Sequence, residues 1–299
     1  MQDAFSAFGG GLKTSEPKFT NHDHEPRFAN KGSQPRPANK GSQTKARKQR
    51  FKMCTLTFIP KPQGYLLGMN RDERLTREPA LPPVAVASGL PAVYPRESGG
   101  GTWIGSNAAG ITFALLNQNP GPHAPPQQRS RGEIIPALLA ASRFPEAMRR
   151  FQQIDLRGVL PFLLVGFFPA EQTISQCRWD GIRLQFFRIG WDVRHWFSSG
   201  VSDEMARKVR GSTCYEAWRR RDAASAEWLR GLHASHSPVR GSFSICVHRP
   251  DAATISYTEI SFTAGDLTMR YHAGHPCQAL GRFDAEITLP PLPLYARSA

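Results

Sequence analysis

The sequence lacks any uninterrupted run of about 18 apolar residues, so no segment is long enough to span a membrane as a helix. It also lacks a CxxC pair, and its 5 cysteines are widely spaced, which indicates neither a zinc site nor a disulfide framework. A reducing cytosol is therefore the simplest compartment. Acidic residues are few, 24 against 38 Lys and Arg, and the net charge is +14. Such a charge alone would suggest a nucleic-acid partner, but half of it lies in a segment that we do not expect to be part of the fold.

Half of this excess charge lies in residues 1–52, which hold 11 Lys and Arg but only 4 Asp and Glu. The segment is polar and repeats ANKGSQ, from Ala29 and from Ala38. It has too few aliphatic residues to offset chain entropy by burial, and it lacks the apolar core of a secretory signal. Two interpretations stay open, a mis-assigned start codon or a disordered basic tail. In neither do we expect nucleic acid to be the partner of the folded domain.

The composition changes at Met53, and residues 53–299 are expected to form the folded domain. Alternation and turn residues predict a hairpin over 54–70, a Pro-rich connection, and a second hairpin that ends at Asn117. Helices are expected over 132–142, 144–154 and much of 203–232. Further strands are expected over 162–168, 173–179, 184–189, 243–247, 253–262 and 268–272. This order predicts an α+β fold of packed layers rather than a parallel βαβ array.

The pair Met53-Cys54 opens this domain. Cysteine is small enough for an initiator methionine before it to be removed, which would leave Cys54 with a thiol and a free α-amine. The amine has a reference pKa of about 7.7–8.0, so it can act as a base near neutral pH. One residue could then supply both nucleophile and base. The alternative is an ordinary buried cysteine on a strand.

The second predicted strand ends on the run Asn70-Arg71-Asp72-Glu73, which a hairpin returns to the neighbourhood of Cys54. Asp72 could accept a hydrogen bond from the Cys54 amine. Arg71 could pair with Asp72 or with an acidic group of a substrate. The alternative is a charged turn with solvated ion pairs, which contribute little to stability.

Four segments, in this order, resemble the successive blocks of the NRDE family, the transport and Golgi organisation proteins. They are MCTLTF from Met53, GMNRDERLTREP from Gly68, GGGTWIGSNAAGITFALLNQ from Gly99 and RGE from Arg131. Two looser matches follow, HWFSSGVSD from His195 and SFSICVHRPDAATISYTE from Ser242. The resemblance covers most of residues 53–275. The family normally begins at Met-Cys, which favours a start at Met53.

The NRDE family is similar to the N-terminal nucleophile hydrolases, so the resemblance implies an αββα four-layer sandwich. It also implies that Cys54 is the nucleophile, that Asp72 orients its amine and that Asn117 donates to an oxyanion. The sequence departs from the bile-salt and penicillin V acylases at Met69, where those enzymes carry an arginine. Here the arginine is Arg71.

Four further residues are expected to bind substrate: Asn70, Glu73, Trp103 and Ser199. Trp103 follows the glycine turn of residues 99–101, which we expect to bring backbone close to Cys54. It is either part of the core or a wall of the pocket. Ser199 replaces a second asparagine of the acylases, which leaves the substrate open.

His272, His275 and Cys277 lie within six residues of one another and could suggest a metal. Because no fourth ligand is evident, we expect a loop there, no metal and no cofactor.

These observations predict a cytoplasmic N-terminal-cysteine hydrolase-like protein that acts on a nonpeptide amide bond of a small molecule. A second hypothesis is a non-catalytic carrier or chaperone that holds haem or a lipid-like ligand in the same pocket. A third, a basic RNA-associated protein, rests on the charge alone. The oligomeric state is left open.

Overall fold

The computed structural model describes residues 53–87, 89–119, 129–263, 265–279, 281–290 and 292. The chain divides into two units, Met1–Arg47 and Lys48–Ala299, and every described residue belongs to the second unit. The hypotheses about residues 1–52 lie outside the described residues. No helix in the described part is long and apolar enough to cross a membrane.

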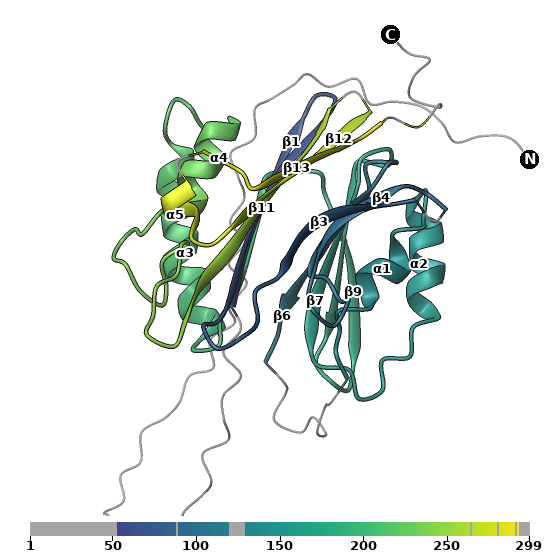
Figure 1. Ribbon diagram of the computed structural model, residues 1–299, viewed down its shortest axis with the longest axis horizontal. Helices are drawn as coiled ribbons and strands as arrows, with labels where there is room; N and C mark the ends of the chain where they lie inside the picture. The colour runs from purple at the N-terminus through teal and green to yellow at the C-terminus, as the bar shows by residue number, and fades with distance from the viewer. Residues whose placement is uncertain are drawn as a thin grey trace, which may run out of the picture. The chain divides into compact units, whose positions relative to one another are not determined.

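Within the described residues of this unit, the strands form two antiparallel sheets (Figure 1). Sheet A has six strands, in the order β10 (Arg194–Ser198), β1 (Met53–Lys61), β2 (Gly64–Arg74), β11 (Ala252–Thr263), β12 (Asp266–Ala273) and β13 (Ala285–Leu289). Sheet B has seven, in the order β3 (Leu81–Val86), β4 (Ala92–Arg96), β5 (Ile104–Asn107), β6 (Thr112–Asn117), β7 (Phe162–Phe168), β8 (Thr173–Trp179) and β9 (Leu184–Ile189).

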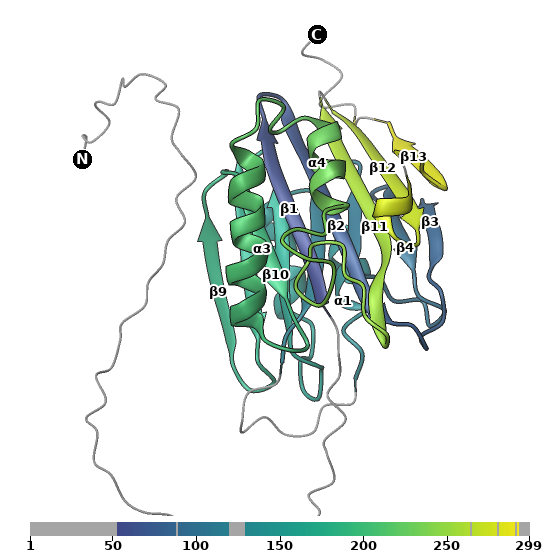
Figure 2. The same cartoon turned by 90° about the vertical axis from the view of Figure 1, so that its left-hand side faces the viewer.

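Helices cover the outer face of each sheet (Figures 1 and 2). Those on sheet A are α3 (Asp203–Trp218), α4 (Ala226–His233) and the short α5 (Pro276–Ala279). Those on sheet B are α1 (Ile134–Leu138) and α2 (Phe144–Gln152). The layers therefore follow the order helix, sheet, sheet, helix. The predicted α+β class and the αββα four-layer sandwich are confirmed.

Strand alternation decides which side chains of β1 lie between the sheets, because successive residues of a strand point to opposite faces. Cys54, Leu56 and Phe58 belong to the core between the two sheets. The Phe58 ring stacks 4.9 Å from the Phe167 ring of sheet B. Thr55 faces the opposite way, toward the helix layer, where it accepts a hydrogen bond from α3. Cys54 thus lies at one end of the central core.

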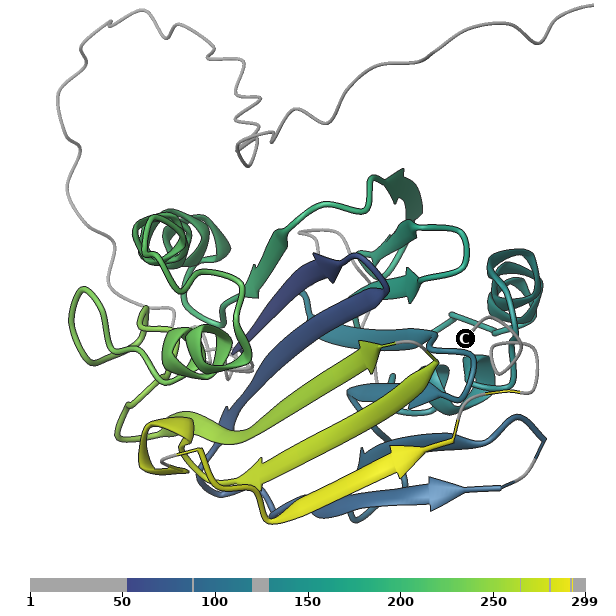
Figure 3. The same ribbon diagram turned by 90° about the horizontal axis from the view of Figure 1, so that it is seen from above.

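The predicted hairpin over residues 54–70 is confirmed as β1–β2, and the second predicted hairpin as β5–β6. Gly64 has a φ of +152° at the turn of the first hairpin. A Cβ atom at this position would overlap the backbone carbonyl of Phe262 in β11. Only glycine therefore allows β2 to pair with β11 here. In Figure 3 the β1–β2 and β11–β12 hairpins lie side by side in sheet A.

Two predictions of local structure are wrong. The Pro-rich connection after the first hairpin contains β3 and β4. β3 is an edge strand with a register shift between Leu81 and Val84, and such edges tolerate proline because one side needs no ladder donors. The strand predicted over 243–247 is irregular, and the region makes an isolated bridge from His248 to Ala253. β10 and β13 were not predicted.

We expect residues 1–52 to be dispensable for folding, because the described core clusters are built from residue 54 onward. A chain that begins at Met53 should melt within a few degrees of the full chain in calorimetry. A loss of several kcal/mol in the free energy of unfolding would show instead that the first 52 residues pack on the domain.

Candidate active site

The register of the β1–β2 hairpin brings the first predicted site residues together. Cys54 lies directly opposite Arg71, and residue 53 lies opposite Asp72. Directly opposite residues share a face of the sheet, so Cys54 and Arg71 both face the interior between the sheets. The peptide that joins residue 53 to Cys54 runs beside the Asp72 position. If the chain ended there, the α-amine of Cys54 would be left next to Asp72.

Sheet B supplies the opposite side of the site. Asn117 ends β6, and Trp103 immediately precedes β5. The Leu115 amide of β6 donates to the Trp103 carbonyl at 2.8 Å, which fixes Trp103 beside that strand.

The glycine turn of residues 99–101 has a packing role. A Cβ atom on Gly101 would lie 2.9 Å from the Cα atom of Gly132, and the Thr102 amide donates to the Gly132 carbonyl at 3.1 Å. Glycine at both positions allows the two backbones to touch. The turn thereby holds Arg131, the neighbour of Gly132, beside Trp103.

These segments enclose a cavity of about 50 Å³. That is well below the roughly 300–1,000 Å³ of most ligand pockets, so a substrate larger than a few atoms would enter only in part or after movement. Six of the eight predicted site residues line it, among these fourteen: Cys54, Arg71, Asp72, Glu73, Arg77, Glu97, Thr102, Trp103, Leu115, Asn117, Ser130, Arg131, Gly132 and Leu160.

Two hydrogen-bond donors of this cavity are buried. Within the described residues, Arg71 Nη1 and Trp103 Nε1 have no hydrogen-bond partner. The Arg71 guanidinium lies 4.2 Å from the centre of the Trp103 ring, and its Nη2 atom donates to Glu97 at 2.8 Å. A buried donor without a partner costs about 1–3 kcal/mol. A carbonyl or carboxylate oxygen bound beside either group would satisfy its donor.

Asp72 lies on the helix side of sheet A and is almost completely buried. Thr254, opposite it on β11, donates to its Oδ1 atom at 2.6 Å, and Arg210 of α3 lies 3.6 Å from its Oδ2 atom. Burial raises the pKa of Asp72 to about 7, although the Arg210 charge and the Thr254 hydroxyl both act to lower it. The Asp72 carboxyl therefore changes protonation near neutral pH.

The Cys54 thiol is buried and protonated at neutral pH. Burial, reinforced by the negative charge of Asp72, raises its pKa to about 12, although a hydrogen bond with the Asp72 backbone acts in the other direction. In this chain the nitrogen of Cys54 is a peptide nitrogen, because residue 53 continues β1. A thiol in this state needs a nearby base before it can react as a nucleophile.

Two predicted substrate-binding residues do not line the cavity. Asn70 points to the helix side, where its amide donates at 2.9 Å to the carbonyls of His233 and Ile245. Ser199 accepts hydrogen bonds from the amides of Val201 and Ser202 in the turn before α3. These contacts give both residues structural roles.

Two arginines of the site were not among the residues predicted from the sequence. Arg210 of α3 is completely buried and donates to the Cys54 carbonyl at 3.3 Å and to the Thr55 hydroxyl at 2.9 Å. Arg131 lines the cavity and donates to the Pro161 carbonyl at 2.9 Å, and burial lowers its pKa to about 10. Arg131 was visible in the RGE segment. Arg210 carried no signal in the sequence, since nothing local distinguishes it from Arg207, the other arginine of α3.

One family model and a number of solved structures match this chain. Residues 53–184 match the model of the family Transport and Golgi organisation 2. A search of curated proteins finds no match. Among solved structures, the chain is similar to penicillin V acylase from Agrobacterium tumefaciens, with 12% identity, a TM-score of 0.40, and 73% of this chain and 82% of that chain covered.

The chain is also similar to a mutant of conjugated bile acid hydrolase from Clostridium perfringens, with 11% identity, a TM-score of 0.44, and 80% and 92% of the two chains covered. A second variant of that hydrolase gives 11% identity, a TM-score of 0.41 and coverage of 80% and 97%. The range of the family match includes every residue that lines the cavity. The match thus confirms the resemblance inferred from the sequence, to the transport and Golgi organisation proteins of the NRDE family, over residues 53–184.

Proposed function

We propose that this protein hydrolyses a nonpeptide amide bond of a small molecule through Cys54, once all residues before Cys54 have been removed. The observation that carries the proposal is the register of the first hairpin, which pairs residue 53 with Asp72. Removal of residue 53 would place a free amine beside both the Cys54 thiol and the Asp72 carboxylate. The proposal includes a cytoplasmic location, because a nucleophilic thiol has to stay reduced.

The proposed reaction has two steps. The Cys54 amine takes the thiol proton, the sulfur attacks the amide carbonyl, and the C–N bond breaks as the amine passes the proton to the leaving nitrogen. Water then attacks the thioester, with the same amine as base, and releases the carboxylic acid and the thiol. The proximity of Asp72 supports a role in orienting the amine, since its carboxylate would stabilise the ammonium form by charge.

The donors that line the cavity support stabilisation of the oxyanion. Asn117 carries an amide, and Arg71 Nη1 and Trp103 Nε1 lack partners among the described residues. In this scheme Arg71 binds the reacting oxygen or an acidic group of the substrate. Glu73, which lines the same cavity, would help to hold Arg71, whose Nη2 atom lies 3.8 Å from it.

We expect Asn117→Ala to lower the rate of acylation about 10²–10³-fold, as loss of one oxyanion donor does in other acyl-transfer enzymes. Single-turnover kinetics, which isolate the acylation step, would measure this. Asn119→Ala is a matched control, because the Asn119 amide donates to the Ser199 carbonyl and does not line the cavity. If the two substitutions lowered the acylation rate equally, Asn117 would not be an oxyanion donor.

A non-catalytic carrier is the second candidate. Two observations favour it. The Cys54 thiol is protonated in the chain that retains residue 53, and two buried donors, Arg71 Nη1 and Trp103 Nε1, have no hydrogen-bond partner among the described residues. In this role the cavity would bind a carbonyl or carboxylate group without reaction.

Mass spectrometry of the intact protein, purified from its native cells, separates the two candidates. We expect a mass that begins at Cys54 and, after incubation with a panel of N-acyl amides and activated esters, a second mass that includes one acyl group on Cys54. A native protein whose mass includes residue 53 would overturn the proposal that this protein is a hydrolase. A mature chain that no panel member acylates would favour the carrier.

A further inference from the structure

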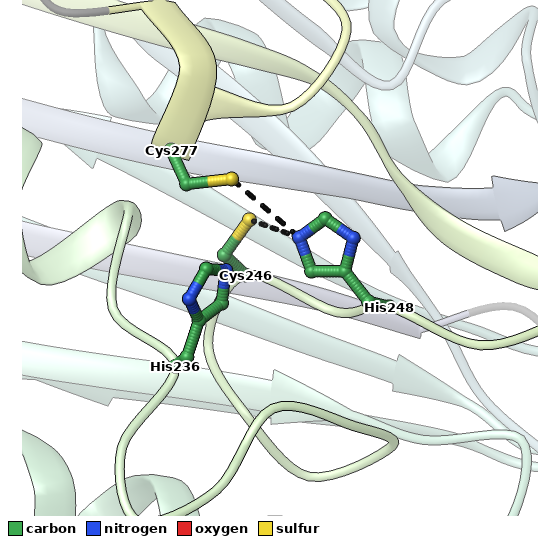
Figure 4. Close-up of side chains that lie close together, drawn as sticks. All are labelled: His236, Cys246, His248 and Cys277. Atoms are coloured by element: carbon green, nitrogen blue, oxygen red, sulfur yellow. Dashed lines mark hydrogen bonds between the residues drawn. The ribbon is translucent and has the colours of Figure 1, made fainter.

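Four potential metal ligands, none of which lines the cavity, meet on the helix side of sheet A. His236 follows α4, Cys246 and His248 precede β11, and Cys277 lies in α5. One ligand atom from each residue lies within 4.8 Å of all the others. Figure 4 shows these side chains turned toward one another from three separate segments of the chain.

The spacing of these atoms fits a tetrahedral zinc ion. The Cys246 and Cys277 sulfurs each lie 3.5 Å from His248 Nε2. With Zn–S bonds of about 2.3 Å and Zn–N bonds of about 2.0–2.1 Å, the sulfur-to-nitrogen edge of a tetrahedron is about 3.5 Å. Two thiolates and two imidazoles form a set typical of structural zinc sites.

The environment of His236 supports the same conclusion. Its Nε2 atom is buried and, among the described residues, has no hydrogen-bond partner. The side chains of His236, His248 and Cys277 are half-buried, which leaves a path for an ion to enter, whereas Cys246 is fully buried. A metal would supply the missing partner of His236.

Two neighbours affect the cluster. His275 donates from Nδ1 to the Thr254 carbonyl at 2.7 Å, and its ring packs 4.4 Å from that of His248. Arg240 approaches His248 Nδ1 at 3.1 Å. A His248 bound to metal through Nε2 carries its proton on Nδ1, so zinc binding requires the exposed Arg240 side chain to turn into solvent.

We propose that His236, Cys246, His248 and Cys277 bind one Zn²⁺ ion in a closed structural site. The two thiols release their protons to solvent as they become thiolates, and the four protein ligands leave no coordination position for a substrate. The site joins the segment before β11 to α5 and to the end of α4.

The ion would also stabilise the position of Asp72 in the candidate active site. The Val247 amide, between two ligands, donates to the Thr254 hydroxyl at 2.8 Å, and that hydroxyl donates to Asp72 at 2.6 Å. Fixing residues 246–248 therefore fixes the hydroxyl that orients Asp72. The zinc site itself does not depend on whether Cys54 is catalytic.

The test uses the full chain, purified without chelator, and measures bound metal by elemental mass spectrometry. We expect about one zinc per chain, and after exchange with Co²⁺ the intense near-ultraviolet absorption of thiolate-bound cobalt. Cys246→Ser and Cys277→Ser should each weaken zinc binding at least about 100-fold. Cys177→Ser, at a buried cysteine of sheet B, should leave binding unchanged.

If the serine variants fail to fold, alkylation of the unmutated chain gives the answer. Zn²⁺ should protect Cys277 from iodoacetamide, as mapped by mass spectrometry, and a chelator should restore its reaction. The proposal is overturned if zinc-saturated protein retains less than about 0.1 ion per chain, if Co²⁺ gives no thiolate absorption, or if Cys246 and Cys277 form a disulfide in protein purified under reducing conditions.

Discussion

Replacing Cys54 by alanine in a chain that begins at Met53 is expected to abolish amide hydrolysis and to leave the fold intact. Removal of the methionine then leaves an N-terminal alanine, which keeps the amine beside Asp72 but has no nucleophile. Cys54 is almost completely buried at the end of the central core, so the substitution removes one sulfur atom from its wall. Turnover is measured with whichever amide acylates the unmutated protein, and folding by thermal melting.

Two further variants separate chemistry from packing. Cys54→Ser keeps a weaker nucleophile together with the α-amine, so slow turnover should survive. Cys177→Ala removes a sulfur from a core position of sheet B and should leave the rate unchanged. If the Cys54→Ala protein turned over substrate at more than about 1% of the rate of the unmutated protein, Cys54 would not be the nucleophile.

The parts of this site that could be predicted from the sequence are those determined by residues close to one another in the chain. A two-residue turn, with glycine at position 64, fixes the pairing of Cys54 with Arg71, and the alternation of β1 then decides which side chains enter the core. The same local logic predicted the β5–β6 hairpin and the end of β6 at Asn117.

What the sequence could not predict depends on contacts between distant segments. Arg210 reaches the Cys54 carbonyl across 156 positions of the chain, and no periodicity of α3 indicates that contact. The prolines near residue 82 suggested a loop, because proline is excluded from central strands but not from the edge strand that β3 forms. The four-residue cluster around His248 was missed for the same reason, since only the fold joins its three segments.

Asn70 differs from its neighbours in the motif, because consecutive residues of a strand do not share one face. Alternation along β2 sends Arg71 and Glu73 toward the interior and Asn70 and Asp72 toward the helices. Asp72 nevertheless lines the cavity, whereas the Asn70 amide donates to the carbonyls of His233 and Ile245. The side chains of the Asn70–Glu73 run therefore lie alternately on the two faces of sheet A.

We expect Arg210→Met to lower the free energy of unfolding by about 3–5 kcal/mol at pH 8, the usual cost of breaking a buried ion pair by removing one partner. Arg210 is completely buried, and its guanidinium compensates the Asp72 carboxylate at 3.6 Å while it also bonds Cys54 and Thr55. Methionine fills a similar length of the site without charge. Chemical denaturation of the chain that retains residue 53 provides the measurement.

The pH dependence of this loss identifies its cause. Burial raises the pKa of Asp72 from 3.8 to about 7, so the folded state holds this proton more tightly than the unfolded state, and the contribution of Asp72 to stability falls as the pH rises from about 4 to 7. The positive charge of Arg210 limits this rise in pKa. In the Arg210→Met protein the pKa of Asp72 is therefore higher, and stability continues to fall above pH 7.

At pH 5 Asp72 is neutral in both the unmutated protein and the variant. The loss of stability caused by Arg210→Met should therefore be smaller at pH 5 than at pH 8, by about 1 kcal/mol. Made in an Asp72→Asn background and compared with that background, Arg210→Met should cost the same at pH 5 and pH 8. An equal loss at pH 5 and pH 8 in the single variant would mean that Arg210 stabilises the fold through its hydrogen bonds to β1 and not through the charge of Asp72.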